Sequence, residues 1–158
     1  MDTATSIPLP PGTALRHAES AAALRACWPV ARQLRPQLAG IDDYLERVQR
    51  MRQHSYRVLV AWHGERVLAL AGYRLQENLV YGRFLYVDDL VSAEEVRGQG
   101  WGARLIVATR QLAAQAGCAH VVLDTAIANT AAQRFYTAQG LANKATRFSC
   151  AVPAEVAA

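Results

Sequence analysis

Near the start of the chain, apolar residues recur with the period of a helix. Four apolar residues recur at three- and four-residue steps: Leu24, Cys27, Ala31 and Leu34. This spacing predicts a helix with Ser20 as its N-cap. Pro29 is expected to kink or restart the helix, and Pro36 with Gly40 to end it.

The same helical period returns three more times along the chain. The predicted helices cover residues 43–53, 102–116 and 129–140. Asp43 with Glu46 has the form of a capping box at the start of the first of these helices. Gly117 is a typical residue after a helix end, and Asn129 is a favoured N-cap.

Between these helices lie short runs rich in β-branched and aromatic residues. The predicted strands are residues 14–17, 56–62, 66–75, 83–91, 119–123 and 144–152. His63-Gly64 predicts a tight turn between the second and third of them. The strands come first as hairpins and then alternate with helices, which predicts an α/β (α+β mixed) fold with helices on both faces of a mixed sheet. Residues 1–12 are interpreted as a Pro-rich tail and 13–158 as one domain.

Composition narrows the class of protein. The chain has 158 residues, of which 52% are hydrophobic and 19% charged, as expected for a globular domain. No apolar run approaches the ~18 residues of a membrane helix. The first residues lack the charged and apolar regions of a signal peptide. We therefore expect a cytoplasmic protein without a membrane partner.

Charge and metal-binding residue types exclude two further classes. The net charge is +4, and Lys144 is the only lysine among 17 basic residues. Arginine binds phosphate with a planar fork, so an anionic ligand is expected. The arginines are dispersed and form no nucleic-acid motif, so no nucleic-acid partner is predicted. The three cysteines and four histidines have no metal-binding spacing, so no metal site is predicted.

The sequence VRGQGWGARL, residues 96–105, places glycines at 98, 100 and 102 just before an apolar helical run. A P-loop is excluded because no Lys and Ser or Thr follow the glycines. The pattern Gly98-x-Gly100-x-x-Ala103, with Asp124 downstream, satisfies a dinucleotide-binding fingerprint. Fewer than 60 residues follow it, however, which is too short a chain to complete that fold.

A third ligand fits the loop better. A helix that begins near Gly102 has free backbone N–H groups and a partial positive charge at its N-terminus, and these point outward. Glycines leave those donors unobstructed, which favours the diphosphate of coenzyme A. A loop whose glycines serve turn geometry alone is the alternative.

The motif Arg97-x-x-Gly100-x-Gly102, followed by Asn129 and then Phe135-Tyr136, resembles the GNAT superfamily of N-acetyltransferases. The segment LDTAIANTAAQRFYTAQGL strengthens the resemblance, and FLYVDDLVSAEEVRGQGWG is similar to the bacterial small-molecule branch. The resemblance implies the GNAT acyl-CoA N-acyltransferase fold, with a mostly antiparallel sheet. It also implies acetyl transfer from acetyl-CoA to a primary amine of a small molecule or peptide, by direct attack in a ternary complex without metal. A homodimer is possible, as in other members.

The resemblance also implies the residues that hold the cosubstrate. The backbone of Leu90, Val91 and Ser92 would pair with the pantetheine arm. The diphosphate would lie on Arg97, Gly98, Gln99, Gly100, Trp101 and Gly102. Trp101 and Ser92 depart from the family's usual aliphatic residues, and the indole either packs inside or covers part of the cosubstrate. Asn129 would contact acetyl-CoA as well as cap its helix; capping alone is the alternative.

Two catalytic roles follow from the resemblance. Tyr136 would be the general acid, because a phenol can protonate a departing thiolate; a core tyrosine is the alternative. Asp88 and Asp124 are the two candidate bases, and a third possibility is that neither acts. Strand alternation predicts that Asp88 and Asp89 point to opposite faces of the sheet. A non-catalytic acyl-CoA-binding module is the alternative function, and no pattern in the sequence identifies the acceptor.

Overall fold

The computed structural model describes residues 6–154. These residues form two compact units, divided between Leu123 and Asp124. The first unit contains the sheet and three of the helices, and the second contains one helix and the end of the described chain. Each unit is described by itself below.

A five-stranded sheet forms the centre of the first unit. Its strands are adjacent in chain order: β1 (Thr13–His17), β2 (Arg57–His63), β3 (Arg66–Asn78), β4 (Gly82–Ser92) and β5 (His120–Leu123). The first four strands pair antiparallel, and β5 pairs parallel to β4. The prediction of a mixed, mostly antiparallel sheet is therefore confirmed.

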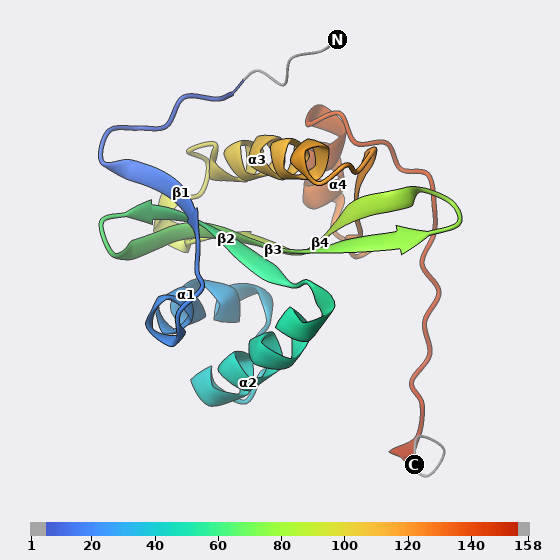
Figure 1. Ribbon diagram of the computed structural model, residues 1–158, viewed down its shortest axis with the longest axis horizontal. Helices are drawn as coiled ribbons and strands as arrows, with labels where there is room; N and C mark the ends of the chain where they lie inside the picture. Colours follow the sequence, from blue (N-terminus) through green and yellow to red (C-terminus); the bar gives the residue numbers. More distant parts are fainter. Residues whose placement is uncertain (1–5, 155–158) are drawn as a thin grey trace. The chain divides into compact units, whose positions relative to one another are not determined.

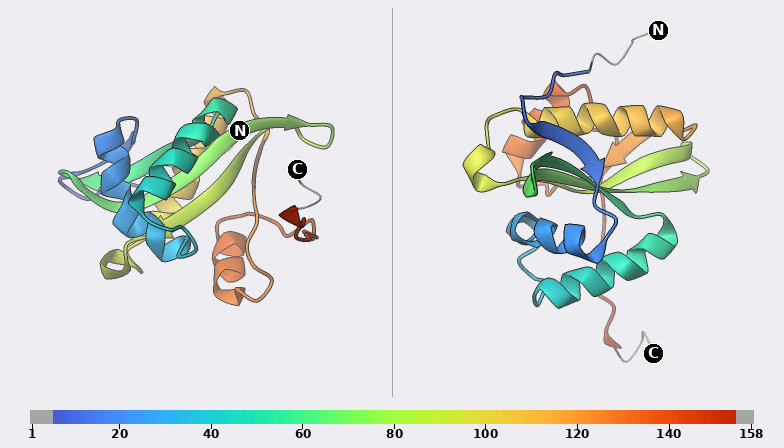
Figure 2. Two further views of the ribbon diagram at one scale, coloured as in Figure 1. Left: turned by 90° about the horizontal axis from the view of Figure 1, so that it is seen from below. Right: turned by 60° about the vertical axis from the view of Figure 1, so that its left-hand side comes forward.

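Helices cover both faces of this sheet, as predicted. Helices α1 (Ala21–Leu34) and α2 (Ile41–Met51) lie on one face, and α3 (Trp101–Gln115) lies on the other (Figures 1 and 2). The interior of β2 and most of β3 are buried because both of their faces are covered. Strands covered on both faces read as continuous apolar runs, which explains why the sequence of these two strands does not alternate.

The core lies between the sheet and the helices on either side. Its largest fully buried side chains include Leu70, Leu85, Leu105 and Ile106. Removing such a leucine would leave a cavity and cost about 2–5 kcal/mol. The packed core therefore holds the sheet, and with it the polar residues at the end of β4, in a fixed position.

The first two helices agree with the prediction only in part. Ser20 caps α1 as predicted, accepting a hydrogen bond from the Ala23 N–H at 3.1 Å. The helix runs through Pro29 without restarting. Helix α2 begins two residues before Asp43, so the predicted capping box is wrong. The Asp43 carboxylate lies in the first turn and accepts from the Ala39 N–H instead.

The second unit is built around α4 (Thr130–Ala138). Asn129 caps this helix as predicted, because its side-chain oxygen accepts from the Ala132 N–H at 3.1 Å. The strand predicted at residues 144–152 is wrong: residues 141–153 have no helix or strand assignment. Strand-forming residues need a neighbouring strand for their backbone hydrogen bonds, and no strand pairs with this segment in the part of the chain described.

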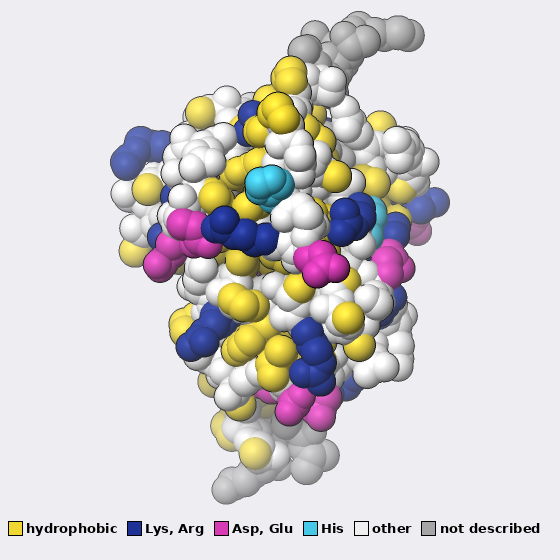
Figure 3. Space-filling view, turned by 90° about the vertical axis from the view of Figure 1, so that its left-hand side faces the viewer, with side chains coloured by type: hydrophobic (Ala, Val, Ile, Leu, Met, Phe, Trp, Pro, Cys, Tyr) yellow, Lys and Arg dark blue, Asp and Glu magenta, His cyan; other side chains and the backbone are white. Residues whose placement is uncertain are grey.

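Several surface arginines are paired with acidic side chains. Arg57 and Arg52 both contact Glu19, and Arg66 donates to Glu95 at 2.7 Å. On the face drawn in Figure 3, basic and acidic side chains lie next to one another rather than in separate patches. Within residues 6–154, no helix is long and apolar enough to cross a membrane.

Candidate active site

A bulge in β4 organises the polar residues of the first unit. The register passes from Gly72 opposite Asp89 to Tyr73 opposite Val87, so Asp88 is an extra residue without a partner in β3. A bulge interrupts the two-residue alternation of a strand and redirects its side chains. As a result, Asp88 and Asp89 line the same cavity. The prediction that they point to opposite faces is wrong for this reason.

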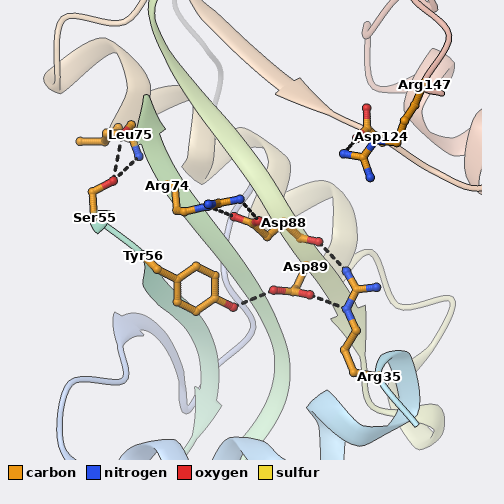
Figure 4. Close-up of polar contacts among 9 residues, drawn as sticks. All are labelled: Arg35, Ser55, Tyr56, Arg74, Leu75, Asp88, Asp89, Asp124 and Arg147. Atoms are coloured by element: carbon orange, nitrogen blue, oxygen red, sulfur yellow. Dashed lines mark hydrogen bonds and ion pairs between the residues drawn. The ribbon is translucent and has the colours of Figure 1, made fainter. Parts of the chain in front are cut away.

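Two arginines and a tyrosine engage both aspartates (Figure 4). Arg74, on β3, donates to both carboxylate oxygens of Asp88, at 2.9 and 2.6 Å. Arg35, at the end of α1, donates to the Asp89 carboxylate and to the Asp88 carbonyl, both at 2.7 Å. The Tyr56 hydroxyl donates to the other Asp89 oxygen at 2.7 Å. Every carboxylate oxygen at the bulge therefore has a hydrogen-bond donor.

Burial shifts the pKa values of Asp88 and Tyr56 in this cluster. The side chains of Asp88 and Asp89 are 14% and 16% exposed. Burial raises the pKa of Asp88, and the bonds from Arg74 oppose that rise. Burial and the charge of Asp89 hold the pKa of Tyr56 well above its usual value. The Tyr56 phenol is therefore protonated at neutral pH and acts as a donor.

Gly72 makes this arrangement sterically possible. A Cβ at this position would lie 2.0 Å from the Tyr56 hydroxyl oxygen and 2.8 Å from an Asp89 carboxylate oxygen. Real Cβ atoms essentially never approach another atom so closely. No residue with a side chain therefore fits at position 72 while Tyr56 and Asp89 keep their hydrogen bond.

The bulge borders a cavity of about 220 Å³ on the side of α1 and α2. Its walls are mainly apolar and include Leu34, Tyr44 and Val91, while Arg35 and Arg47 contribute positive charge. The negative charges of Asp88 and Asp89 are already balanced by Arg74 and Arg35. The cavity therefore combines apolar walls with one polar, internally neutralised edge.

Beyond the bulge, β4 is hydrogen-bonded to only one neighbouring strand. Strand β5 pairs with residues 84–87 of β4 and no further, whereas β3 follows β4 to Ser92. Leu90, Val91 and Ser92 lie in this last part of β4. Their side chains are half-buried. One edge of the strand thus lacks a partner strand among the described residues of the sheet.

The glycine loop follows directly, after a short 3₁₀ helix, η2 (Glu94–Val96). Gly98 and Gly100 have φ values of +78° and +83°, which strongly favour glycine. Five backbone N–H groups in this loop have no hydrogen-bond acceptor among the described residues. They belong to Gly98, Gly100, Trp101, Gly102 and Ala103. The N-terminus of α3 has no side-chain cap either. The loop therefore presents the unpaired donors that an anion needs.

The two side chains in this loop lie differently. Arg97 is exposed, with its guanidinium 3.4 Å from the Gln33 side-chain oxygen. The Trp101 indole is 3% exposed and belongs to the hydrophobic core. The suggestion that the indole covers a ligand is therefore wrong, and packing is its role. Only the Trp101 backbone N–H remains available to a ligand.

The remaining candidate residues belong to the second unit. Asp124 forms an ion pair with Arg147 (Figure 4). Asn129 begins α4, and Tyr136 lies two turns further along it, with its ring 5.3 Å from that of Phe135. Burial raises the pKa of Tyr136. Both predicted bases therefore have arginine partners, and the predicted acid is a half-buried phenol.

The first unit brings the bulge, the free edge of β4 and the glycine loop together along one stretch of chain. Sequence reasoning missed four residues of the cluster: Arg35, Tyr56, Gly72 and Arg74. They come from three distant parts of the chain, namely the end of α1, the residue before β2, and β3. They match no short motif, so only their contacts at the bulge identify them. No group of three or more His, Cys, Asp or Glu in residues 6–154 is placed to hold a metal ion.

The chain is similar in sequence to known N-acetyltransferases. The chain is 29% identical to the N-acetyltransferase YhdJ of Bacillus subtilis, over 70% of this chain and 78% of that one. It is 42% identical to an aminoglycoside N(6')-acetyltransferase of Serratia marcescens, over 36% and 39% of the two chains.

Solved structures share the fold. The aminoglycoside N-acetyltransferase AAC(6')-Iy, solved in complex with CoA, has a TM-score of 0.80 at 17% identity, over 92% of this chain and 98% of that one. An Agrobacterium tumefaciens putative acetyltransferase has a TM-score of 0.75 at 22% identity, over 88% and 99%. The model of the acetyltransferase (GNAT) family matches residues 19–141. The chain therefore belongs to the GNAT family of acetyltransferases.

Proposed function

We propose that this acetyltransferase moves an acetyl group from acetyl-CoA to a primary amine of a small molecule or peptide, by direct attack in a ternary complex. The observation that carries the proposal is the row of unpaired N–H groups at the start of α3, next to the unpaired edge of β4. A diphosphate is an anion of the size that such a row of donors binds. Each hydrogen bond to a charged oxygen contributes about 1.5–3 kcal/mol.

In this proposal most contacts with acetyl-CoA come from one continuous segment of the chain, residues 90–102. Residues 97–102 hold the diphosphate through the backbone, and Leu90, Val91 and Ser92 pair with the amides of the pantetheine arm. A Cβ on Gly98 would meet no protein atom within 4 Å, so space is open above the loop. Asn129, whose side-chain oxygen already accepts a bond from Ala132, would use its remaining polar atoms for the cosubstrate.

Acetyl-CoA supplies a thioester whose carbonyl carbon accepts the amine. The C–N bond forms, the C–S bond breaks, the amine loses a proton and the thiolate gains one. Tyr136 donates that proton, because its raised pKa keeps the phenol protonated at neutral pH. Asp88 receives the amine proton, directly or through water, with Asp124 as the second candidate. Burial favours Asp88 for this role, whereas its two bonds from Arg74 oppose it.

The acceptor is proposed to enter beside the cavity between α1, α2 and β4. Similarity to an aminoglycoside acetyltransferase over 57 residues makes aminoglycosides one class to test. Because the carboxylates at the bulge are already paired, monoamines with an apolar body form the contrasting class. Amino acids, polyamines and peptide N-termini complete the panel.

The experiment measures thiol release from acetyl-CoA with each amine, for the wild type and Tyr136→Phe. We expect Tyr136→Phe to lower kcat at least 100-fold, roughly the contribution of a positioned acid. Tyr81→Phe, which removes a phenol from the β3–β4 hairpin, is the matched control and should behave like the wild type. Equal turnover by Tyr136→Phe and the wild type would refute the assignment of the acid. Binding of acetyl-CoA without turnover of any amine would instead favour a non-catalytic acyl-CoA-binding module.

A further inference from the structure

Arg104, in the first turn of α3, connects three parts of the first unit. Its Nη1 donates to the backbone carbonyl of Gln99 at 2.9 Å, inside the glycine loop. Its Nε donates to the backbone carbonyl of Pro8 at 3.0 Å, in the segment before β1. Its guanidinium carbon lies 5.0 Å from the centre of the Trp101 ring. One side chain therefore joins the loop, the N-terminal segment and the core.

The glycine loop is shaped to accept this guanidinium. A Cβ on Gly100 would lie 3.1 Å from Arg104 Nη1, so a larger residue there would push against it. The Arg104 guanidinium lies over the ring of the buried Trp101 indole. This contact is favourable because cations are attracted to the face of an aromatic ring. This contact gives a physical reason for a tryptophan at a position where the family usually has an aliphatic residue.

The bond to Gln99 affects which groups the loop offers to a ligand. When a carbonyl in a tight loop is fixed by an internal donor, the neighbouring peptide planes have less freedom to rotate. Four of the unpaired N–H groups, from Gly100 to Ala103, follow directly in the chain. Their directions are therefore held in advance by Arg104, and less conformational entropy is lost when an anion binds.

We propose that Arg104 is a positioning residue for the diphosphate of the cosubstrate, and that Trp101 and the Pro8 carbonyl hold Arg104 in place. The inference rests on the proposed function, because it assumes that the loop binds the diphosphate. Arg104 acts through the Gln99 backbone, so its role differs from that of Arg97, which lies exposed in the loop itself. The N-terminal segment thereby becomes part of the cosubstrate site.

The test compares two acetyl donors that differ in the diphosphate. Acetyl-CoA carries this group, whereas S-acetylpantetheine lacks it. For Arg104→Gln we expect KM for acetyl-CoA to rise about tenfold with kcat nearly unchanged, the loss expected for one charge-assisted hydrogen bond. The kcat/KM for S-acetylpantetheine should stay within about twofold of the wild type. Arg104→Lys, which keeps the positive charge and a donor group, should recover part of the loss.

Two further variants separate positioning from folding. Arg83→Gln removes the same charge at the far end of β4 and should leave both donors unaffected. Deletion of residues 2–9 removes the Pro8 carbonyl and should raise KM for acetyl-CoA in the wild type, but have little further effect in Arg104→Gln. Thermal unfolding of each variant identifies a general loss of structure, and isothermal titration with CoA measures binding without turnover.

Each outcome has one meaning. An unchanged KM for acetyl-CoA in Arg104→Gln, with CoA still bound, would overturn this inference and leave the proposed function standing. An equal loss with both donors would overturn it as well, because the diphosphate would then be irrelevant. Failure of the wild-type protein to bind CoA at all would refute the proposed function itself.

Discussion

Gly72 gives the sharpest prediction about the structure, because a single methyl group there meets two partners of the β4 bulge. In Gly72→Ala the new Cβ would lie 2.0 Å from the Tyr56 hydroxyl oxygen and 2.7 Å from Tyr56 Cζ. The Tyr56 ring is 4% exposed and packed in the core, so it cannot simply turn into solvent. The hydroxyl must move by roughly 1 Å, and this separates it from Asp89.

Two costs then add. Forcing an extra methyl group into a packed site costs about 1–3 kcal/mol. Losing a hydrogen bond to a charged, half-buried carboxylate costs about 1.5–3 kcal/mol more. We therefore expect the free energy of unfolding to fall by roughly 2.5–6 kcal/mol, a large part of the ~5–15 kcal/mol that stabilises a typical domain. The midpoint of thermal unfolding should fall by roughly 10 °C.

Urea and thermal unfolding followed by circular dichroism measure this loss. Gly40→Ala is the matched control, since a Cβ on Gly40 meets nothing within 4 Å, and it should change stability far less. Combining Gly72→Ala with Tyr56→Phe removes the atom at 2.0 Å, so the double variant should be more stable than the sum of the single effects predicts. A wild-type midpoint for Gly72→Ala would refute the packing described for the bulge.

Two further predictions concern ionisation and capping. Because burial raises the pKa of Asp88, its contribution to stability is present below its ordinary pKa of 3.8 and is lost as the pH rises through the raised value. Asp88→Asn should remove that acidic step from the curve of stability against pH, and should lower kcat/KM if Asp88 is the base; an unchanged rate and pH profile would exclude that role. Asn129→Ala should destabilise the protein by about 1 kcal/mol through loss of the α4 cap. Asn129→Ser should restore the cap, so a KM for acetyl-CoA that stays raised in this variant would identify a contact with the cosubstrate, and full recovery would indicate capping alone.

Local sequence patterns predicted most of the helices and strands. Apolar periodicity located α1, α3 and α4 and the strands β1 to β5 to within a few residues, because each element must bury one or both faces. Ser20 and Asn129 were identifiable as caps because their hydrogen bonds stay within three residues of the chain. The segment at 144–152 has strand-forming residues but no strand assignment, because a strand also needs a partner that its own sequence does not specify.

The sequence by itself determined the family and the glycine loop, because both depend on residues close together in the chain. Only the tertiary structure decided where Asp88 and Asp89 point and which side chains they contact. The bulge depends on the register between β3 and β4, and it brings Asp88 and Asp89 to one cavity against the alternation of the strand. Arg35 reaches Asp89 across 54 positions of sequence. Long-range pairing of this kind depends on the packing of whole elements, so no local pattern could reveal it.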